Sequence, residues 1–153
     1  MRRAPVTRVV GGLLGVVLAG ALGACGDDGG QDTDADSTAL PSCLASLTPV
    51  TIPTDGTFPT DWAFPPGTVV TGTQEVPGGG LAITAQVGAD FEKVLPFMQS
   101  ELEKAGFVAT KGEAEHDDAE ATWTGGGFSG TWAIKASEDC AGTTLLQVAA
   151  APQ

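Results

Sequence analysis

The stretch ADFEKVLPFMQSELEKAGF, residues 89–107, decides the fold because it is the clearest helix in the chain. Its large apolar side chains recur at the three- and four-residue spacing of one helix face: Phe91, Val94, Leu95, Met98 and Leu102. Asp90 is a residue type that caps the start of a helix, and Gly106 is one that ends it. The sequence therefore predicts one amphipathic helix between Asp90 and Gly106, with Pro96 inside it, where a proline either kinks the helix or delays its regular part.

Strand-like segments lie on both sides of this helix. TVVTGTQEV (68–76) and LAITAQV (81–87) flank the turn signal PGGG, which predicts a β-hairpin. Four more strand-like segments follow the helix: 107–112, 119–125, 127–136 and 143–151. This order predicts an α+β fold, mainly an antiparallel β-sheet with the helix packed on one face. We expect a single domain over residues 43–153.

The second face of such a sheet is free to meet water. The polar residues that alternation places there are Thr84, Gln86, Thr122, Thr124, Ser129, Thr131 and Lys135. In the Pro-rich segment before the first strand, Trp62 and Phe64 alternate and are expected to pack onto the domain. The polar face and the Trp62–Phe64 segment together are the candidate binding surface.

The charge of the chain is strongly acidic, with 7 Lys and Arg against 19 Asp and Glu. Three of the basic residues lie in residues 1–24, so the rest of the chain has a net charge of 4 − 19 = −15. Such a surface repels phosphate backbones, which argues against a nucleic-acid partner.

The first 24 residues have the composition of a secretory signal peptide. Arg2, Arg3 and Arg8 precede the uncharged apolar run VVGGLLGVVLAGAL, residues 9–22. This run is shorter than the roughly 20 residues that cross a bilayer core, and small residues follow its end. We therefore expect residues 1–24 to direct export and to be removed.

The sequence LGAC, residues 22–25, resembles the lipobox of bacterial lipoproteins. The resemblance implies cleavage after Ala24 and a diacylglyceryl group on Cys25, which anchors the chain to the extracytoplasmic side of the cell membrane. Two acyl chains hold a protein on a membrane stably, whereas one does so only marginally. Residues 25–42 are rich in Asp, Gly and Ser, which predicts an acidic, disordered tether. The strand and helix order of residues 58–107 also loosely resembles that of small envelope lipoproteins.

The three cysteines fit this interpretation. If Cys25 is acylated, Cys43 and Cys140 remain as a pair in an oxidising compartment, where disulfides form. We therefore expect a Cys43–Cys140 disulfide that closes nearly the whole domain.

The chain offers little that suggests catalysis. It has one His and no Tyr, and no nucleophile–base arrangement can be assembled from it. His116 lies in the acidic segment GEAEHDDAEA, residues 112–121, which we interpret as a solvated turn rather than a metal site. The glycines of TGGGFSG, residues 124–130, lack the Lys of a phosphate loop and predict a hairpin. No metal, cofactor or catalytic residue is predicted.

Three functions remain open at this point. The leading hypothesis is a lipid-anchored extracytoplasmic binding or interaction module without catalysis, which holds a protein or a small molecule. The alternative is a small carrier whose sheet and helix enclose an apolar ligand. A third is an envelope hydrolase with converging carboxylates.

Overall fold

The predicted helix is present as α1 (Phe91–Lys104) in the computed structural model, which describes residues 41–153. Its apolar face is buried through Phe91, Val94, Met98 and Leu102. Gly106, at a φ of 90°, ends the helix, and the Phe107 N–H donates to the Leu102 carbonyl at 2.9 Å. Asp90 is the N-cap residue and Pro96 lies inside the helix, both as expected, but Asp90 makes no side-chain capping hydrogen bond.

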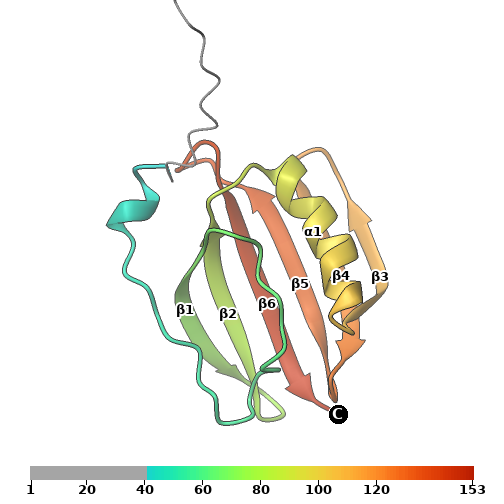
Figure 1. Cartoon of the computed structure of the whole chain (residues 1–153). Helices are drawn as coiled ribbons and strands as arrows, with labels where there is room; N and C mark the ends of the chain where they lie inside the picture. The colour runs from blue at the N-terminus through green and yellow to red at the C-terminus, as the bar shows by residue number, and fades with distance from the viewer. Residues whose placement is uncertain (1–40) are drawn as a thin grey trace, which may run out of the picture. The chain divides into compact units, whose positions relative to one another are not determined.

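Six antiparallel strands form one sheet, which confirms the α+β fold (Figure 1). The strands are β1 (Thr68–Val76), β2 (Gly80–Val87), β3 (Val108–Ala114), β4 (Asp118–Gly125), β5 (Phe128–Ala136) and β6 (Thr144–Pro152). Their order across the sheet is β1-β2-β6-β5-β4-β3, so the last strand lies between the first hairpin and β5. Gly130 permits this insertion, because a Cβ there would overlap the carbonyl oxygen of Ala149 on β6.

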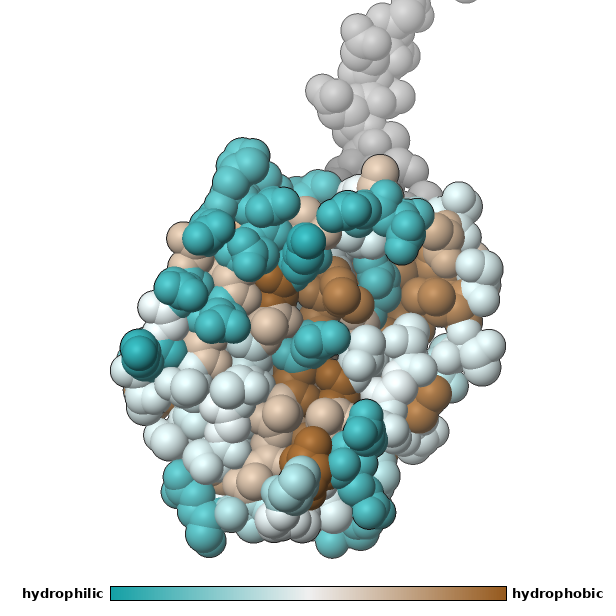
Figure 2. All heavy atoms as spheres, turned by 180° about the vertical axis from the view of Figure 1, so that it is seen from behind, coloured by the Kyte–Doolittle hydropathy of each residue, from teal (hydrophilic) through white to brown (hydrophobic). Residues whose placement is uncertain are grey.

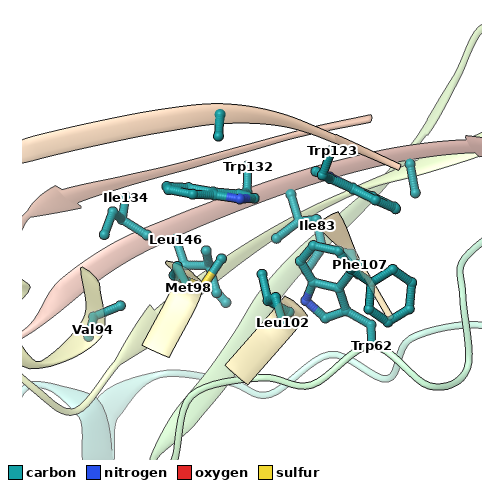
Figure 3. Packing of buried hydrophobic residues seen from close by; sticks show 14 of the residues in the cluster. Trp62, Ile83, Val94, Met98, Leu102, Phe107, Trp123, Trp132, Ile134 and Leu146 are labelled. Carbon is teal, nitrogen blue, oxygen red and sulfur yellow. The ribbon is translucent and has the colours of Figure 1, made fainter. Parts of the chain in front are cut away.

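The core lies between α1 and one face of the sheet (Figure 3). Alternate residues of the central strands point into it, with Ile83 from β2, Trp132 and Ile134 from β5, and Leu146 from β6. Met98 and Leu102 meet them from the helix. These side chains fill the space between the two layers, so that the apolar pattern of each segment is used in one common core.

The segment before β1 follows one edge of the sheet (Figure 1). It contains a short 3-10 helix, η1 (Leu44–Ser46), and then runs beside β1, where the Val50 N–H donates to the Val70 carbonyl at 2.8 Å. Further along, Phe58 and Trp62 turn into the core. One edge of the sheet therefore has a neighbouring segment, and the opposite edge is β3.

Three expectations lie outside the described residues. These are the signal peptide at 1–24, the lipidation of Cys25 and all but the end of the tether at 25–42. Within residues 41–153, no helix is long and apolar enough to cross a membrane.

Candidate functional site

The face of the sheet opposite α1 carries hydrophilic side chains around a paler, partly apolar centre (Figure 2). The residues predicted to line it alternate along their strands with buried ones: Thr84 and Gln86 with Ile83, Ala85 and Val87, Thr122 and Thr124 with Ala121 and Trp123, and Ser129, Thr131 and Lys135 with Trp132 and Ile134. All seven therefore lie on this face, which we call the open face. The antiparallel sheet has the one buried and one wet side that alternation predicts.

The open face is not uniformly polar. Its centre carries the half-buried apolar residues Ala82, Ala133, Leu145 and Ala149. Figure 2 shows apolar side chains along the middle of this face among hydrophilic ones. Charged residues gather on the side of β4 and β3, at Lys111, Glu113, Asp118 and Glu120. The face thus combines a small apolar strip with a charged flank.

Three shallow hollows follow one another across the open face. The first, of about 500 Å³, lies beside the disulfide and is lined in part by Leu47, Gln86, Lys135 and Leu145. A second, of about 210 Å³, shares Lys135 and Leu145 with it and extends to Glu120. A third, of about 310 Å³, continues from Glu120 to Glu113 on β3. Each hollow opens to solvent, as a contact surface for a partner does.

A disulfide joins Cys43 to Cys140 at the end of the open face, as predicted. Its Cα atoms are 6.0 Å apart and 97 residues separate the two cysteines in the chain. The loop that carries Cys140 is held by Thr143, whose hydroxyl donates to the Cys140 carbonyl at 2.6 Å and accepts from the Gln86 side chain. The disulfide therefore joins two segments that border the 500 Å³ hollow, and the hydrogen bond between Thr143 and Gln86 holds one of them to β2.

The two aromatic residues of the candidate surface behave differently. Trp62 is only 6 % exposed, with its ring centroid 4.6 Å from Trp123 and 5.0 Å from Phe107 (Figure 3). Its indole N–H has no hydrogen-bond partner among the described residues, a cost of placing that ring in an apolar cluster. Phe64 is half-buried and stacks with Phe58 at 6.2 Å. The prediction of packing is right, but Trp62 is wrong as a surface contact because the core buries its ring.

The acidic segment around His116 forms the turn between β3 and β4. The Glu115 N–H donates to the Asp118 carbonyl at 2.8 Å, which leaves His116 and Asp117 at the tip. All residues from Glu113 to Asp118 are exposed. Within residues 41–153, no three His, Cys, Asp or Glu side chains are grouped so that they could hold a metal ion.

One carboxylate is held by a local turn far from this segment in the chain. The Thr57 hydroxyl, at 2.7 Å, and the Thr57 N–H, at 3.2 Å, donate to Asp55. These hydrogen bonds favour the charged form and hold the pKa of Asp55 below its ordinary value. The contact stabilises the turn before Phe58 and offers no buried pocket for chemistry.

The chain was compared with family models, curated proteins and solved structures. No family model, no curated protein and no solved structure matches the chain. Its function must be argued from its own geometry. Sequence reasoning missed Leu145 and Gln147 of the open face, although their alternation with the buried Leu146 and Val148 in LLQV would have placed them there.

Proposed function

We propose that this protein is a lipid-anchored, extracytoplasmic binding module that holds a partner protein on the open face and performs no catalysis. The observation that carries the proposal is the line of shallow hollows across the open face, which α1 does not cover and which ends beside the Cys43–Cys140 disulfide. Broad, shallow and mixed polar–apolar surfaces of this kind suit a protein partner better than a small molecule, which prefers a deep cleft.

The exported location rests on the sequence and is supported by the disulfide. The lipobox-like LGAC and the signal-like segment before it indicate export. The disulfide between Cys43 and Cys140 agrees with this, because disulfides form in oxidising compartments outside the cytoplasm. An anchored chain meets partners in or near the same membrane, where a modest affinity is sufficient because the local concentration is high.

The carrier alternative draws less support from the fold. A carrier needs an apolar cavity, and the space between α1 and the sheet is occupied by large side chains, including Trp123, Trp132 and Met98. The 500 Å³ hollow lies instead at the surface, beside Lys135 and Glu138.

Membrane fractionation tests the anchor. Changing Cys25→Ala is expected to move the protein from the membrane fraction to the soluble extracytoplasmic fraction. Retention of the variant on membranes would contradict the lipid anchor.

Site-specific photo-cross-linking in membranes tests the open face. A photoreactive residue at Thr131, exposed on the open face, is expected to cross-link to a discrete partner. The same residue at Lys93, exposed on α1, is the matched control and should give no such product. Equal products at both positions, or none at any open-face position, would refute the proposal.

A further inference from the structure

The two edges of the sheet differ in what lies beside them. β1 has the lead-in segment at its side, with the hydrogen bond from Val50 to Val70. β3 forms the other edge, and all seven of its residues are exposed. No described segment lies along its outer side in the strand order. An edge of this kind presents unpaired backbone groups that can accept another strand.

The register shows which backbone groups of β3 point outward. Glu115 bonds to Asp118 across the turn, and paired residues of an antiparallel ladder alternate between bonded and non-bonded pairs. Glu113, opposite Glu120, is therefore in a bonded pair, whereas Ala114 and Gly112 are in non-bonded pairs. The N–H and C=O groups of Ala114 and Gly112 face away from β4, where an added strand would bond to them.

The helix side of this edge leaves room for side chains. A hollow of about 370 Å³ lies between Gln99 of α1 and β3, and reaches Trp132. The β3 residues that face it are small: Ala109, Gly112 and Ala114. Gly112 also allows β3 to approach β4 closely, because a Cβ there would lie 2.7 Å from the Cβ of Ala121. Alternate side chains of an added strand would point towards this hollow.

The other side of the edge carries an unbalanced negative charge. Glu113 and Glu120 are directly opposite in the β3–β4 register, an arrangement of like charges that destabilises a sheet. On β5, Ala133 is directly opposite Glu120, and the nearest base of that strand, Lys135, is opposite Asp118. Lys111 is the only Lys or Arg in β3, β4 and their turn, against the acidic Glu113, Glu115, Asp117, Asp118 and Glu120, and His116 lies at the tip of that turn. A cation placed beside Glu113 would relieve the repulsion.

We propose that the β3 edge binds an extended, basic segment of a partner protein, which adds to the sheet as a seventh strand. A Lys or Arg of that segment lies opposite Glu113 and reaches Glu120. The neighbouring residues of the segment are small or apolar and point into the hollow beside Gln99 and Trp132. Backbone pairing supplies affinity, and the charge and the hollow supply specificity. This inference rests on the proposed binding function and names the chemistry of its partner.

A second copy of the chain fits this edge less well. Each chain from residue 25 onwards has a net charge of 4 − 19 = −15, so that two copies repel each other. A basic segment is attracted to the same charge.

A peptide-binding assay tests the proposal. The protein is the chain from residue 25 onwards, and it carries the change Cys25→Ala so that no lipid is attached and no detergent is needed. The probe is a fluorescent peptide of alternating Lys and Val, and its matched control has the same sequence with every backbone nitrogen methylated. The control keeps every charge but cannot pair along an edge. We expect the first to bind and the second to lose at least about tenfold in affinity, since several backbone hydrogen bonds are removed. Equal affinity for the two peptides would show that the peptide is bound by charge attraction alone, without backbone pairing, and would overturn the proposal.

Two variants locate the binding. The double change Glu113→Gln and Glu120→Gln is expected to lower the affinity for the peptide by about tenfold, because the pairing of its charges with these carboxylates is lost. The matched control, Glu75→Gln with Glu103→Gln, removes two exposed carboxylates elsewhere and should weaken it far less. Hydrogen exchange should slow at the amides of Gly112 and Ala114 when the peptide is bound. Slowing along β1 instead, or equal loss in both variants, would refute the assignment.

The outcomes separate this inference from the proposed function. Partner cross-links at Thr131 with no peptide binding at β3 would overturn the edge proposal and leave the binding module intact. Concentration-dependent dimers that protect the amides of Gly112 and Ala114 would assign the edge to a second copy and overturn the proposal of a basic partner.

Discussion

The disulfide offers the sharpest test of how this fold is stabilised. Cys43 and Cys140 close a loop with a sequence separation of 97 residues. In the chain-entropy model, a loop of this size stabilises the folded state by about 4.7 kcal/mol at 25 °C, because it restricts the unfolded chain. That is a large part of the 5–15 kcal/mol by which a domain of ordinary size is stable.

The structure indicates that the disulfide stabilises the fold mainly by restricting the unfolded chain, and that the folded chain keeps its conformation without it. Leu44, next to Cys43, is 4 % exposed, and Val50 bonds to Val70 in β1, so the start of the loop stays in place without the cross-link. Thr143 holds the other end through the Cys140 carbonyl. We therefore expect the double change Cys43→Ala and Cys140→Ala to keep the fold but to lower its melting temperature by roughly 20 °C, taking the usual unfolding entropy per residue.

Urea unfolding followed by tryptophan fluorescence measures the free energy of unfolding of both proteins, since Trp62 and Trp123 are buried in the folded state. The variant should lose up to about 4.7 kcal/mol, and its denaturant dependence should steepen because its unfolded chain is less compact. A reducing agent should reproduce the change in the parent and leave the variant unaffected. A loss below about 1 kcal/mol with an unchanged slope would refute the reasoning.

Three further outcomes follow from the packing and the turn contacts. Changing Gly130→Val should destabilise the domain by more than about 3 kcal/mol, because its side chain would overlap the β6 backbone at Ala149, and thermal unfolding would detect this. Met98→Ala should cost about 2–5 kcal/mol in the same assay, since Met98 is 1 % exposed. Thr57→Val should raise the pKa of Asp55 towards its ordinary value in a carboxyl NMR titration. Because folding lowers that pKa, the contact stabilises the fold above the ordinary pKa and is lost as the pH falls. An unchanged Asp55 titration, or a Gly130→Val melting curve like that of the parent, would contradict these contacts.

Much of the fold could be predicted because its signals are local. The apolar spacing from Phe91 to Leu102 and the left-handed Gly106 define α1 without reference to the rest of the chain. Alternation likewise placed Thr84 and Thr131 on the open face, because successive side chains of a strand point to opposite sides. These features depend on neighbours a few residues away.

The candidate site was only partly predictable. Trp62 and Phe64 were correctly expected to pack, but alternation cannot tell which side of the sheet a lead-in segment crosses. It crosses the side of α1, and Trp62 is therefore part of the core beside Trp123. The outward backbone of Gly112 and Ala114 also had no sequence signal, since it depends on which strand becomes the edge.

The elements of this protein can be derived from local sequence patterns: the helix from its 3.6-residue apolar period, the strands from their alternation and the acidic charge from composition. The pairing of Cys43 with Cys140 was also expected from the cysteine count. The tertiary structure was needed to show that β6 lies between β2 and β5 and that β3 is left as an open edge beside Glu113 and Glu120. The physical reason is that local periodicity specifies which face of a segment is apolar. The pairing of segments far apart in the chain depends instead on how all those faces fill one core.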